Sequence, residues 1–422
     1  MKAYQTQNIR NVVLLGSTKS GKTTLSEAML YEGKVIDRRG TVEAKNTVSD
    51  NAEIEQINQR SIYATPLYAE FMDTKFNIID TPGADDFVGG AVSAFKVCDT
   101  GVLVVNAQQG VEVGTQIFSR YAKEYGIPMI VAVNQLDGEK ASWENTLETM
   151  KEAFGNKPVV VQYPVEVGAG FDGFIDVLKM KLYRFEGDTG KRQDMEIPAD
   201  RMEEAEELRN ALIERAAEYD DTLMETFFDQ GSLSEDEIRK GLGIGIREGA
   251  VMPIFCLSAK KDIGVKRLME FTIRTAASPA ERKLVTKDEK VIECKQEAPV
   301  SLFIYKTAVE QHLGEVAYFK VMSGELSHCL AHLLLVLRIL CLHSTTILVV
   351  REVDVLVADV STWCTESHVG LCSAKLHCTS YVTGDKVSNL LLLLAGYCID
   401  CRDSFLVTCF RVLKVHTFCK LA

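Results

Sequence analysis

The chain has 422 residues, with 47 basic and 59 acidic side chains, a formal net charge of −12 and 46% hydrophobic residues. That length provides buried core for about two or three domains and excludes a small fold held together by disulfides. The negative charge is atypical of a protein that coats nucleic acid regardless of sequence, although local basic patches can still contact RNA. Residues 1–10 are polar and show no apolar stretch or cleavage site of a signal peptide, so we expect a cytoplasmic protein.

The composition changes abruptly near residue 326. All nine prolines and all twelve methionines lie in residues 1–326, whereas nine of the twelve cysteines and six of the seven histidines lie in residues 327–422. Three interpretations compete for this C-terminal segment: a membrane segment, a metal-binding module and translation out of frame. We favour a shift of reading frame shortly after Leu326, because proline, methionine and glutamine are lost together. Coding DNA with an undisturbed frame would contradict this hypothesis.

The other two interpretations of the segment have weaker support. Leu330–Leu342 is interrupted by His332 and Arg338, and it falls short of a clean span of about 20 apolar residues. Cys398 and Cys401 form one CxxC pair, without the second pair that a zinc ribbon requires. We therefore expect residues 327–422 to be an irregular tail that does not form native structure.

A phosphate-binding loop is predicted near the N-terminus. Asn11–Leu15 reads as an apolar strand, and a helical pattern begins at Leu25. The residues between them fit GxxxxGK[ST]: Gly16, Ser17, Thr18, Lys19, Ser20, Gly21, Lys22, Thr23 and Thr24. Backbone N–H groups of such a loop surround phosphates at a helix N-terminus. Lys22 is expected to neutralise β- and γ-phosphate oxygens, and the Thr23 hydroxyl to hold Mg²⁺.

The next apolar strand, Phe76–Ile79, ends in Asp80-Thr81-Pro82-Gly83. A carboxylate at the end of a strand beside the phosphates can hold Mg²⁺ through water. We expect Asp80 in that role and the Gly83 N–H as a donor to the γ-phosphate.

Two further strand ends predict selectivity for guanine. Met129–Val133 is followed by Asn134, Gln135, Leu136 and Asp137. Asp137 can accept hydrogen bonds from guanine N1–H and the exocyclic amine, and Asn134 can brace the loop. The last strand, Pro253–Leu257, leads into Ser258, Ala259 and Lys260. There the Ala259 N–H is expected to reach guanine O6, while the stem of Lys260 lies on the ring.

With Gly101–Asn106, these apolar strands predict an α/β fold with a doubly wound, mostly parallel sheet that is buried on both faces. In sequence and order, the motifs resemble the N-terminal part of the translational GTPases, most closely the elongation factor G family. Segments 298–303, 312–315 and 321–324 resemble the opening of that family's second domain, a β-barrel.

The resemblance implies a domain organisation. A GTP-binding (G) domain is expected over residues 1–280, and it should include an inserted helical or α+β subdomain at about 163–246. The β-barrel domain would begin at 297–326 and give way to the tail.

The chain departs from the family in its second switch, the segment that begins at Asp80. The family has a histidine after DTPG, which orients the water that attacks the γ-phosphate, but this chain has Ala84. Phosphoryl transfer depends on positioning and electrostatics. No catalytic residue is therefore identified, and we expect GTP hydrolysis to be weak or absent while binding persists.

Other departures concern the nucleotide contacts. Arg60–Tyr63 occupies the place of the family's RGIT, whose threonine completes the Mg²⁺ shell, and Thr65 is a nearby substitute. Lys19 replaces an aspartate that is thought to hold a monovalent cation. Gln135 replaces the lysine of NKxD, which shortens a stem that packs on the purine.

The resemblance implies a monomeric elongation factor that binds GTP or GDP with Mg²⁺. It would act on the ribosome, through contacts with rRNA and ribosomal proteins, in translocation of tRNA and mRNA. No contact with a membrane is expected. A ribosome-protection factor of the tetracycline-resistance type shares this N-terminal layout. A GTP-binding scaffold outside translation is a third alternative, against which the second-domain resemblance argues.

Overall fold

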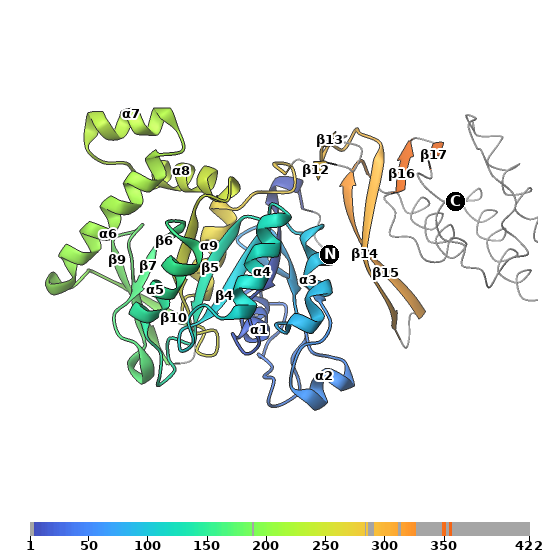
Figure 1. Ribbon diagram of the computed structural model, residues 1–422, viewed down its shortest axis with the longest axis horizontal. Helices are drawn as coiled ribbons and strands as arrows, with labels where there is room; N and C mark the ends of the chain where they lie inside the picture. The colour runs from blue at the N-terminus through green and yellow to red at the C-terminus, as the bar shows by residue number, and fades with distance from the viewer. Residues whose placement is uncertain are drawn as a thin grey trace, which may run out of the picture. The chain divides into compact units, whose positions relative to one another are not determined.

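The computed structural model describes residues 4–187, 190–282, 284–285, 291–310, 314–325, 348–351 and 354–356. They belong to two compact units, Met1–Arg282 and Lys283–Ala422. Figure 1 shows the elements of both units.

The first unit is built on a seven-stranded sheet in the order β2-β3-β1-β4-β5-β11-β6. Its strands are β1 (Ile9–Leu15), β2 (Thr65–Phe71), β3 (Thr74–Asp80), β4 (Thr100–Asn106), β5 (Met129–Asn134), β6 (Pro158–Val160) and β11 (Met252–Cys256). Only β2 among these strands runs antiparallel to its neighbour, β3. Strand β4 is buried throughout, as expected for a parallel strand covered on both faces. The structure confirms the predicted α/β fold.

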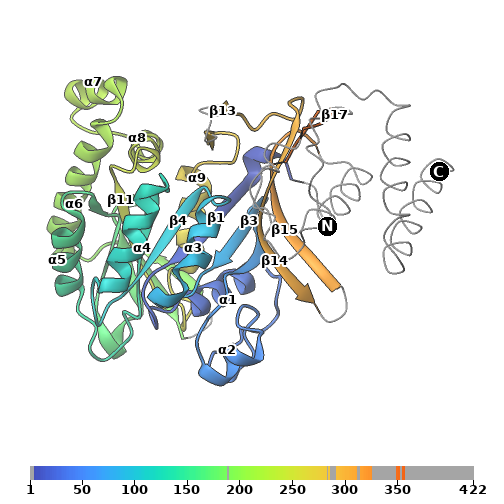
Figure 2. The same cartoon turned by 45° about the vertical axis from the view of Figure 1, so that its right-hand side comes forward.

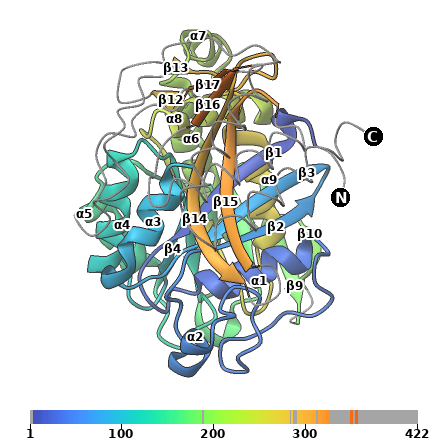
Figure 3. The ribbon, with the colours of Figure 1, turned by 90° about the vertical axis from the view of Figure 1, so that its right-hand side faces the viewer.

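Helices cover both faces of this sheet. They are α1 (Lys22–Glu32), α3 (Val88–Phe95), α4 (Val113–Glu124), α5 (Trp143–Phe154) and α9 (Val265–Thr275), while the short helix α2 (Glu53–Asn58) lies in the connection from α1 to β2. Helices α3, α4 and α5 lie on one face, and α1 and α9 lie on the other (Figure 3). Fully buried phenylalanines such as Phe76, Phe118 and Phe255 fill the space between the layers.

Residues 162–247 form a smaller α+β part within the first unit. Its antiparallel sheet has the order β10-β9-β8-β7, with β7 (Gln162–Pro164), β8 (Gly173–Asp176), β9 (Lys181–Glu186) and β10 (Lys191–Met195). Three helices follow: α6 (Ala199–Ala217), α7 (Asp221–Gln230) and α8 (Glu235–Arg247). Figure 2 shows these helices grouped beside α5 and β11. Leu212 and Ala216 of α6 are buried, so this helix packs its apolar side while its charged side faces water.

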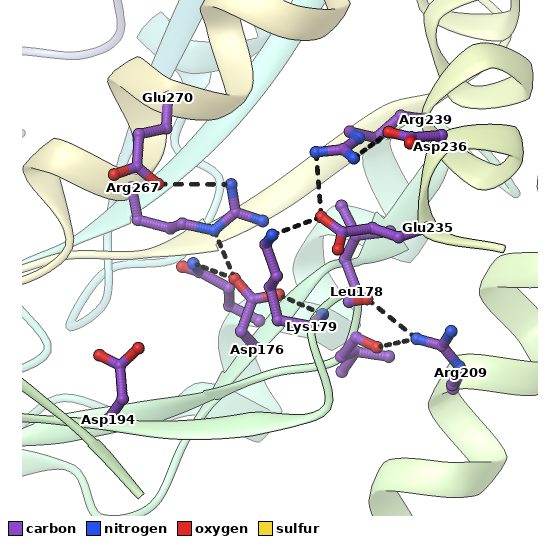
Figure 4. A network of polar contacts seen from close by, with 12 residues as sticks. Asp176, Leu178, Lys179, Asp194, Arg209, Glu235, Asp236, Arg239, Arg267 and Glu270 are labelled. Atoms are coloured by element: carbon purple, nitrogen blue, oxygen red, sulfur yellow. Dashed lines mark hydrogen bonds and ion pairs between the residues drawn. The ribbon is translucent and has the colours of Figure 1, made fainter. Parts of the chain in front are cut away.

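A buried ion pair joins this smaller part to the main sheet's last helix. The Arg267 Nε of α9 lies 2.6 Å from the Asp176 Oδ2 of β8, and Gln162 of β7 donates to the same oxygen. Figure 4 shows this pair beside Glu270. Arg267 and Asp176 are 2% and 0% exposed, so their pairing compensates charges that burial would otherwise penalise.

The second unit contains a β-hairpin extended by short strands. Strands β14 (Val300–Glu310) and β15 (Gly314–Ser323) pair antiparallel, with register shifts at Ser301/Leu302 and Ile304/Lys306. Strands β16 (Leu348–Arg351) and β17 (Asp354–Leu356) continue this sheet from β14. A separate small pair is formed by β12 (Leu284–Val285) and β13 (Val291–Ile292).

Most of the C-terminal tail, including Leu330–Leu342, Cys398 and Cys401, lies outside the described residues. In the described ranges, no helix has the length and apolar character needed to cross a bilayer. Nor do three histidine, cysteine or carboxylate side chains gather there as a possible metal site.

Candidate nucleotide-binding site

The predicted phosphate loop connects β1 to α1 and requires glycine at both ends. Gly16 has φ +137°, and a Cβ there would lie 2.3 Å from the Val104 carbonyl oxygen. Gly21 has φ +92°, and a Cβ there would lie 2.3 Å from Asn134 Nδ2. The loop thus packs closely against β4 and β5. Its glycines allow a phosphate chain to approach the loop backbone closely. The buried Ser20 hydroxyl has no hydrogen-bond partner among the described residues.

The Lys22 side chain folds back onto this loop. Its side chain is 5% exposed, and its Nζ donates to the carbonyl oxygens of Gly16 and Ser17, each at 2.9 Å. Burial lowers the pKa of Lys22 from 10.5 to about 8, opposed by the carboxylates of Asp80, Asp50 and Glu112. An anion at this point would favour the ammonium form, as a nucleotide phosphate does.

Gly83 of the second switch reaches the same point. A Cβ on Gly83 would lie 2.5 Å from Lys22 Nζ and 2.7 Å from the Ser17 carbonyl oxygen. The glycine that was predicted to donate to the γ-phosphate is therefore next to the lysine that was predicted to neutralise it. Of the other loop residues, Thr18 and Thr24 are half-buried, and Lys19 is exposed.

Thr23 and Asp80 meet at a polar corner with the composition of a Mg²⁺ site. Asp80 Oδ2 accepts hydrogen bonds from Thr23 Oγ1 and Ser49 Oγ, each at 2.7 Å. Asp80 Oδ1 is buried and has no hydrogen-bond partner among the described residues. Burial raises the pKa of Asp80, opposed by the hydrogen bonds from Ser49 and Thr23 and by the charge of Lys22. A hard cation with oxygen ligands would satisfy the unpaired oxygen and stabilise the carboxylate, so these residues fit Mg²⁺.

Sequence reasoning missed contacts at this corner from the first switch, which is the connection between α1 and β2 that contains Arg60–Tyr63. Ser61 Oγ lies 3.1 Å from Thr23 Oγ1, whereas Thr65, the substitute suggested by the sequence, is the first residue of β2. Asp50 also lies nearby: burial raises its pKa to about 6, and a hydrogen bond from Ser61 opposes the shift. The signal for Ser61 was its hydroxyl in the predicted switch, but the resemblance to RGIT pointed to the position of Tyr63.

Asn134 ties the predicted base-binding loops to the phosphate loop. Its Nδ2 donates to the Ser20 carbonyl oxygen at 3.0 Å, and its Oδ1 accepts from the Ala259 N–H at 2.9 Å. The expected bracing role of Asn134 thus has a definite geometry. The Ala259 N–H, which was expected to reach guanine O6, donates to Asn134 in this structure.

Gln135 has a different contact from the one that the sequence suggested. Its Nε2 donates to the Lys19 carbonyl oxygen at 2.8 Å, so the side chain supports the phosphate loop. Both residues have positive φ, 63° for Gln135 and 65° for Lys19, a conformation that costs non-glycine residues free energy. The exposed Lys19 side chain contributes less to this arrangement than its backbone does.

The remaining base-loop residues lie at the same edge of the sheet. The Leu136 N–H donates to the Leu257 carbonyl oxygen at 3.3 Å, which aligns the half-buried Asp137 with the following loop. The buried Ser258 accepts from the Lys261 N–H and shapes the turn, and Lys260 is exposed. From the first switch, Arg39 donates to the Ala259 carbonyl oxygen at 3.0 Å.

The second switch lacks a polar side chain at its expected catalytic position. Ala84 is half-buried and precedes η2 (Asp85–Phe87). A second feature that sequence reasoning missed is nearby: the Ser17 hydroxyl donates to the Glu112 carboxylate and lies 3.3 Å from Thr115 Oγ1. Glu112 directly precedes α4.

Comparisons with known proteins identify the family of this chain. Residues 7–278 match the family model described as "Elongation factor Tu GTP binding domain". The chain is 34% identical over 325 residues to an "Elongation factor G-like protein" of Thermotoga maritima, covering 76% of this chain and 46% of that protein. A crystal structure of a Thermus thermophilus protein matches with a TM-score of 0.68 and 29% identity, covering 75% of this chain and 46% of the other.

The chain therefore spans about half the length of the curated relative that it matches. The family model matches more than half of the chain, and the matched domain implies guanine-nucleotide binding. The chain belongs to the elongation factor G-like translational GTPases, of which it carries the N-terminal portion.

Proposed function

We propose that this protein is a GTP-dependent switch that acts on the ribosome in the cytoplasm during translocation of tRNA and mRNA, and that it hydrolyses GTP slowly. The observation that carries the nucleotide part is the amide of Asn134. It holds the phosphate loop at Ser20 and the base loop at Ala259 at the same time. A ligand that fills both loops at once needs a base and a phosphate chain.

The metal part of the proposal rests on the corner formed by Thr23 and Asp80. Bound Mg²⁺ would neutralise charge on the β- and γ-phosphates. Thr23 and Asp80 would hold the ion, and Ser61 would bring the first switch to it. A hydroxyl from the first switch makes the order of that segment depend on the nucleotide.

Slow hydrolysis follows from Ala84. A methyl group neither donates nor accepts a hydrogen bond, so this position gives the attacking water no orientation. Removing a group that positions a reactant costs orders of magnitude in rate, while ground-state binding is affected little.

Nucleotide selectivity is tested by displacement of a fluorescent GDP analogue from the full chain. GTP and GDP should displace it at concentrations at least about 100-fold lower than ATP, because adenine offers Asp137 no matching donors. Lys22→Ala should weaken binding of both guanine nucleotides. Equal displacement by ATP would contradict the proposed site.

The ribosomal role is tested by co-sedimentation of the full chain with ribosomes. More chain should pellet with a non-hydrolysable GTP analogue and Mg²⁺ than with GDP. A matched sample of Asp80→Asn should lose that difference, because its switches no longer sense the γ-phosphate. Equal pelleting of wild type with both nucleotides would contradict a switch on the ribosome.

A further inference from the structure

The carboxylate of Glu112 lies against the phosphate loop, where it contacts Ser17. It accepts a hydrogen bond from the hydroxyl of Ser17, a loop residue that is 6% exposed. Thr115, in the first turn of α4, places its Oγ1 3.3 Å from the same hydroxyl. The backbone start of α4 thus fixes Glu112 against the phosphate loop.

Ser17 connects Glu112 to the predicted γ-phosphate position. The Ser17 carbonyl oxygen accepts from Lys22 Nζ at 2.9 Å, and it lies 2.7 Å from the place that a Cβ of Gly83 would take. The Glu112 charge also raises the pKa of Lys22, which places the carboxylate within electrostatic reach of the ammonium. Glu112, Lys22 and Gly83 therefore surround one loop residue.

The second switch supplies another carboxylate on this side. A Cβ added to Gly114 would lie 3.2 Å from Ser17 Cβ and 3.5 Å from Asp85 Oδ1. Asp85 is exposed and follows Ala84 directly. Among the described residues, the charged groups near Glu112 therefore include Lys22 of α1 and Asp85 of η2, which lies beside the start of α4.

A carboxylate beside a triphosphate is unfavourable unless something lies between them. A water molecule fits this requirement, because it can donate one hydrogen to a carboxylate while its oxygen faces phosphorus. We propose that Glu112 is the catalytic residue that orients the attacking water in this protein and accepts its proton. The inference rests on the proposed function, since it assigns the hydrolysis that Ala84 leaves without a histidine.

In the reaction, the water oxygen forms a bond to the γ-phosphorus, and the bond from that phosphorus to the β–γ bridging oxygen breaks with its electron pair left on GDP. The proton that leaves the water passes to the Glu112 carboxylate and then to the departing phosphate or to solvent. Ser17 keeps the carboxylate in place and takes no proton.

The test is single-turnover hydrolysis of radiolabelled GTP by the full chain, with the Kd for GTP measured in parallel. Glu112→Gln retains an acceptor for the Ser17 hydroxyl but cannot take a proton, so the rate should fall by about 100-fold, while the Kd changes by less than about threefold. Glu112→Asp should recover part of the rate. Glu124→Gln, on an exposed side chain at the C-terminal end of α4, should match wild type.

The pH profile separates catalysis from structure. The hydrolysis rates of wild type and Glu112→Gln should differ in their dependence on pH, because only wild type has an ionisable group at position 112. Three results would overturn the inference: a wild-type rate in Glu112→Gln, a loss that lies entirely in Kd, or no measurable hydrolysis by wild type at any pH. A wild-type chain that fails to bind GTP would instead contradict the proposed function.

Discussion

Single residues at strand ends are expected to determine which nucleotide this site accepts. Asp137 is half-buried and follows a loop that Asn134 holds at both the phosphate and base sides. A carboxylate at this position would accept two hydrogens from guanine and leave adenine unmatched. Selectivity is therefore expected to depend on the identity of one acceptor.

Asp137→Asn tests that dependence. The amide cannot accept from both guanine donors, so GTP binding should weaken by about 100-fold. Xanthosine triphosphate, which has a carbonyl where guanine has its amine, should bind the variant better than GTP does. Glu139→Gln, an exposed residue of the same loop, is the control, and retention of wild-type GTP affinity in Asp137→Asn would contradict the assignment.

Lys22 makes nucleotide affinity depend on pH. Burial lowers its pKa from 10.5 to about 8, so between those values the free folded chain binds fewer protons than the unfolded chain, and this group adds stability as the pH rises. Phosphates bind the ammonium form. The Kd for GDP should therefore rise by up to about tenfold per pH unit above pH 8.

The measurement is a titration of Kd from neutral to alkaline pH. Lys22→Arg is the control, because its guanidinium stays charged and it also reports any titration of the guanine base. Its weaker binding should change less with pH. A wild-type Kd that follows the same profile as Lys22→Arg would contradict the lowered pKa.

In the proposed metal site, the first switch would contribute a contact through Ser61. Its Oγ lies 3.1 Å from Thr23 Oγ1, which adjoins the unpaired oxygen of Asp80. Ser61→Ala should raise the Mg²⁺ concentration for half-maximal GTP binding by about tenfold. Thr65→Ala and Tyr63→Phe should have little effect, and a larger effect at Thr65 would restore the ligand that the sequence suggested.

Among the elements, helix α9 connects two parts of the first unit. It follows the base loop and also binds the smaller sheet. Its Arg267 pairs with Asp176 of β8 in a site that excludes water (Figure 4). The free-energy cost of leaving one buried charge without its partner is much larger than the net stabilisation that the intact pair provides.

Arg267→Met should therefore lower the free energy of unfolding by about 3–5 kcal/mol, measured by urea denaturation. Combining it with Asp176→Leu should cost less than the two single changes together, because no unpaired charge remains. Arg201→Met removes an exposed ion pair with Glu204 and should change stability by less than about 1 kcal/mol. Additive losses in the double variant would contradict the coupling of Arg267 and Asp176.

At the scale of the whole molecule, the architecture of the first unit could be predicted from the sequence, because the determinants of that architecture are local. Apolar runs that end in Gly16, Asp80, Asn134 or Ser258 identify parallel strands and bring those residues to one edge of the sheet. The contacts of Ser61 and Glu112 were not predictable in this way. They depend on how irregular segments and a helix start fold back on the phosphate loop, and no periodic pattern encodes such a path.

The central claim is that this protein binds GTP at the site described above and hydrolyses it slowly because Ala84 replaces a histidine. Single-turnover GTP hydrolysis by Ala84→His, compared with wild type in the presence of ribosomes, tests it most directly. We predict a rate at least about 100-fold higher in the variant, with the Kd for GTP unchanged. A variant that binds GTP normally and hydrolyses it at the wild-type rate would contradict the claim.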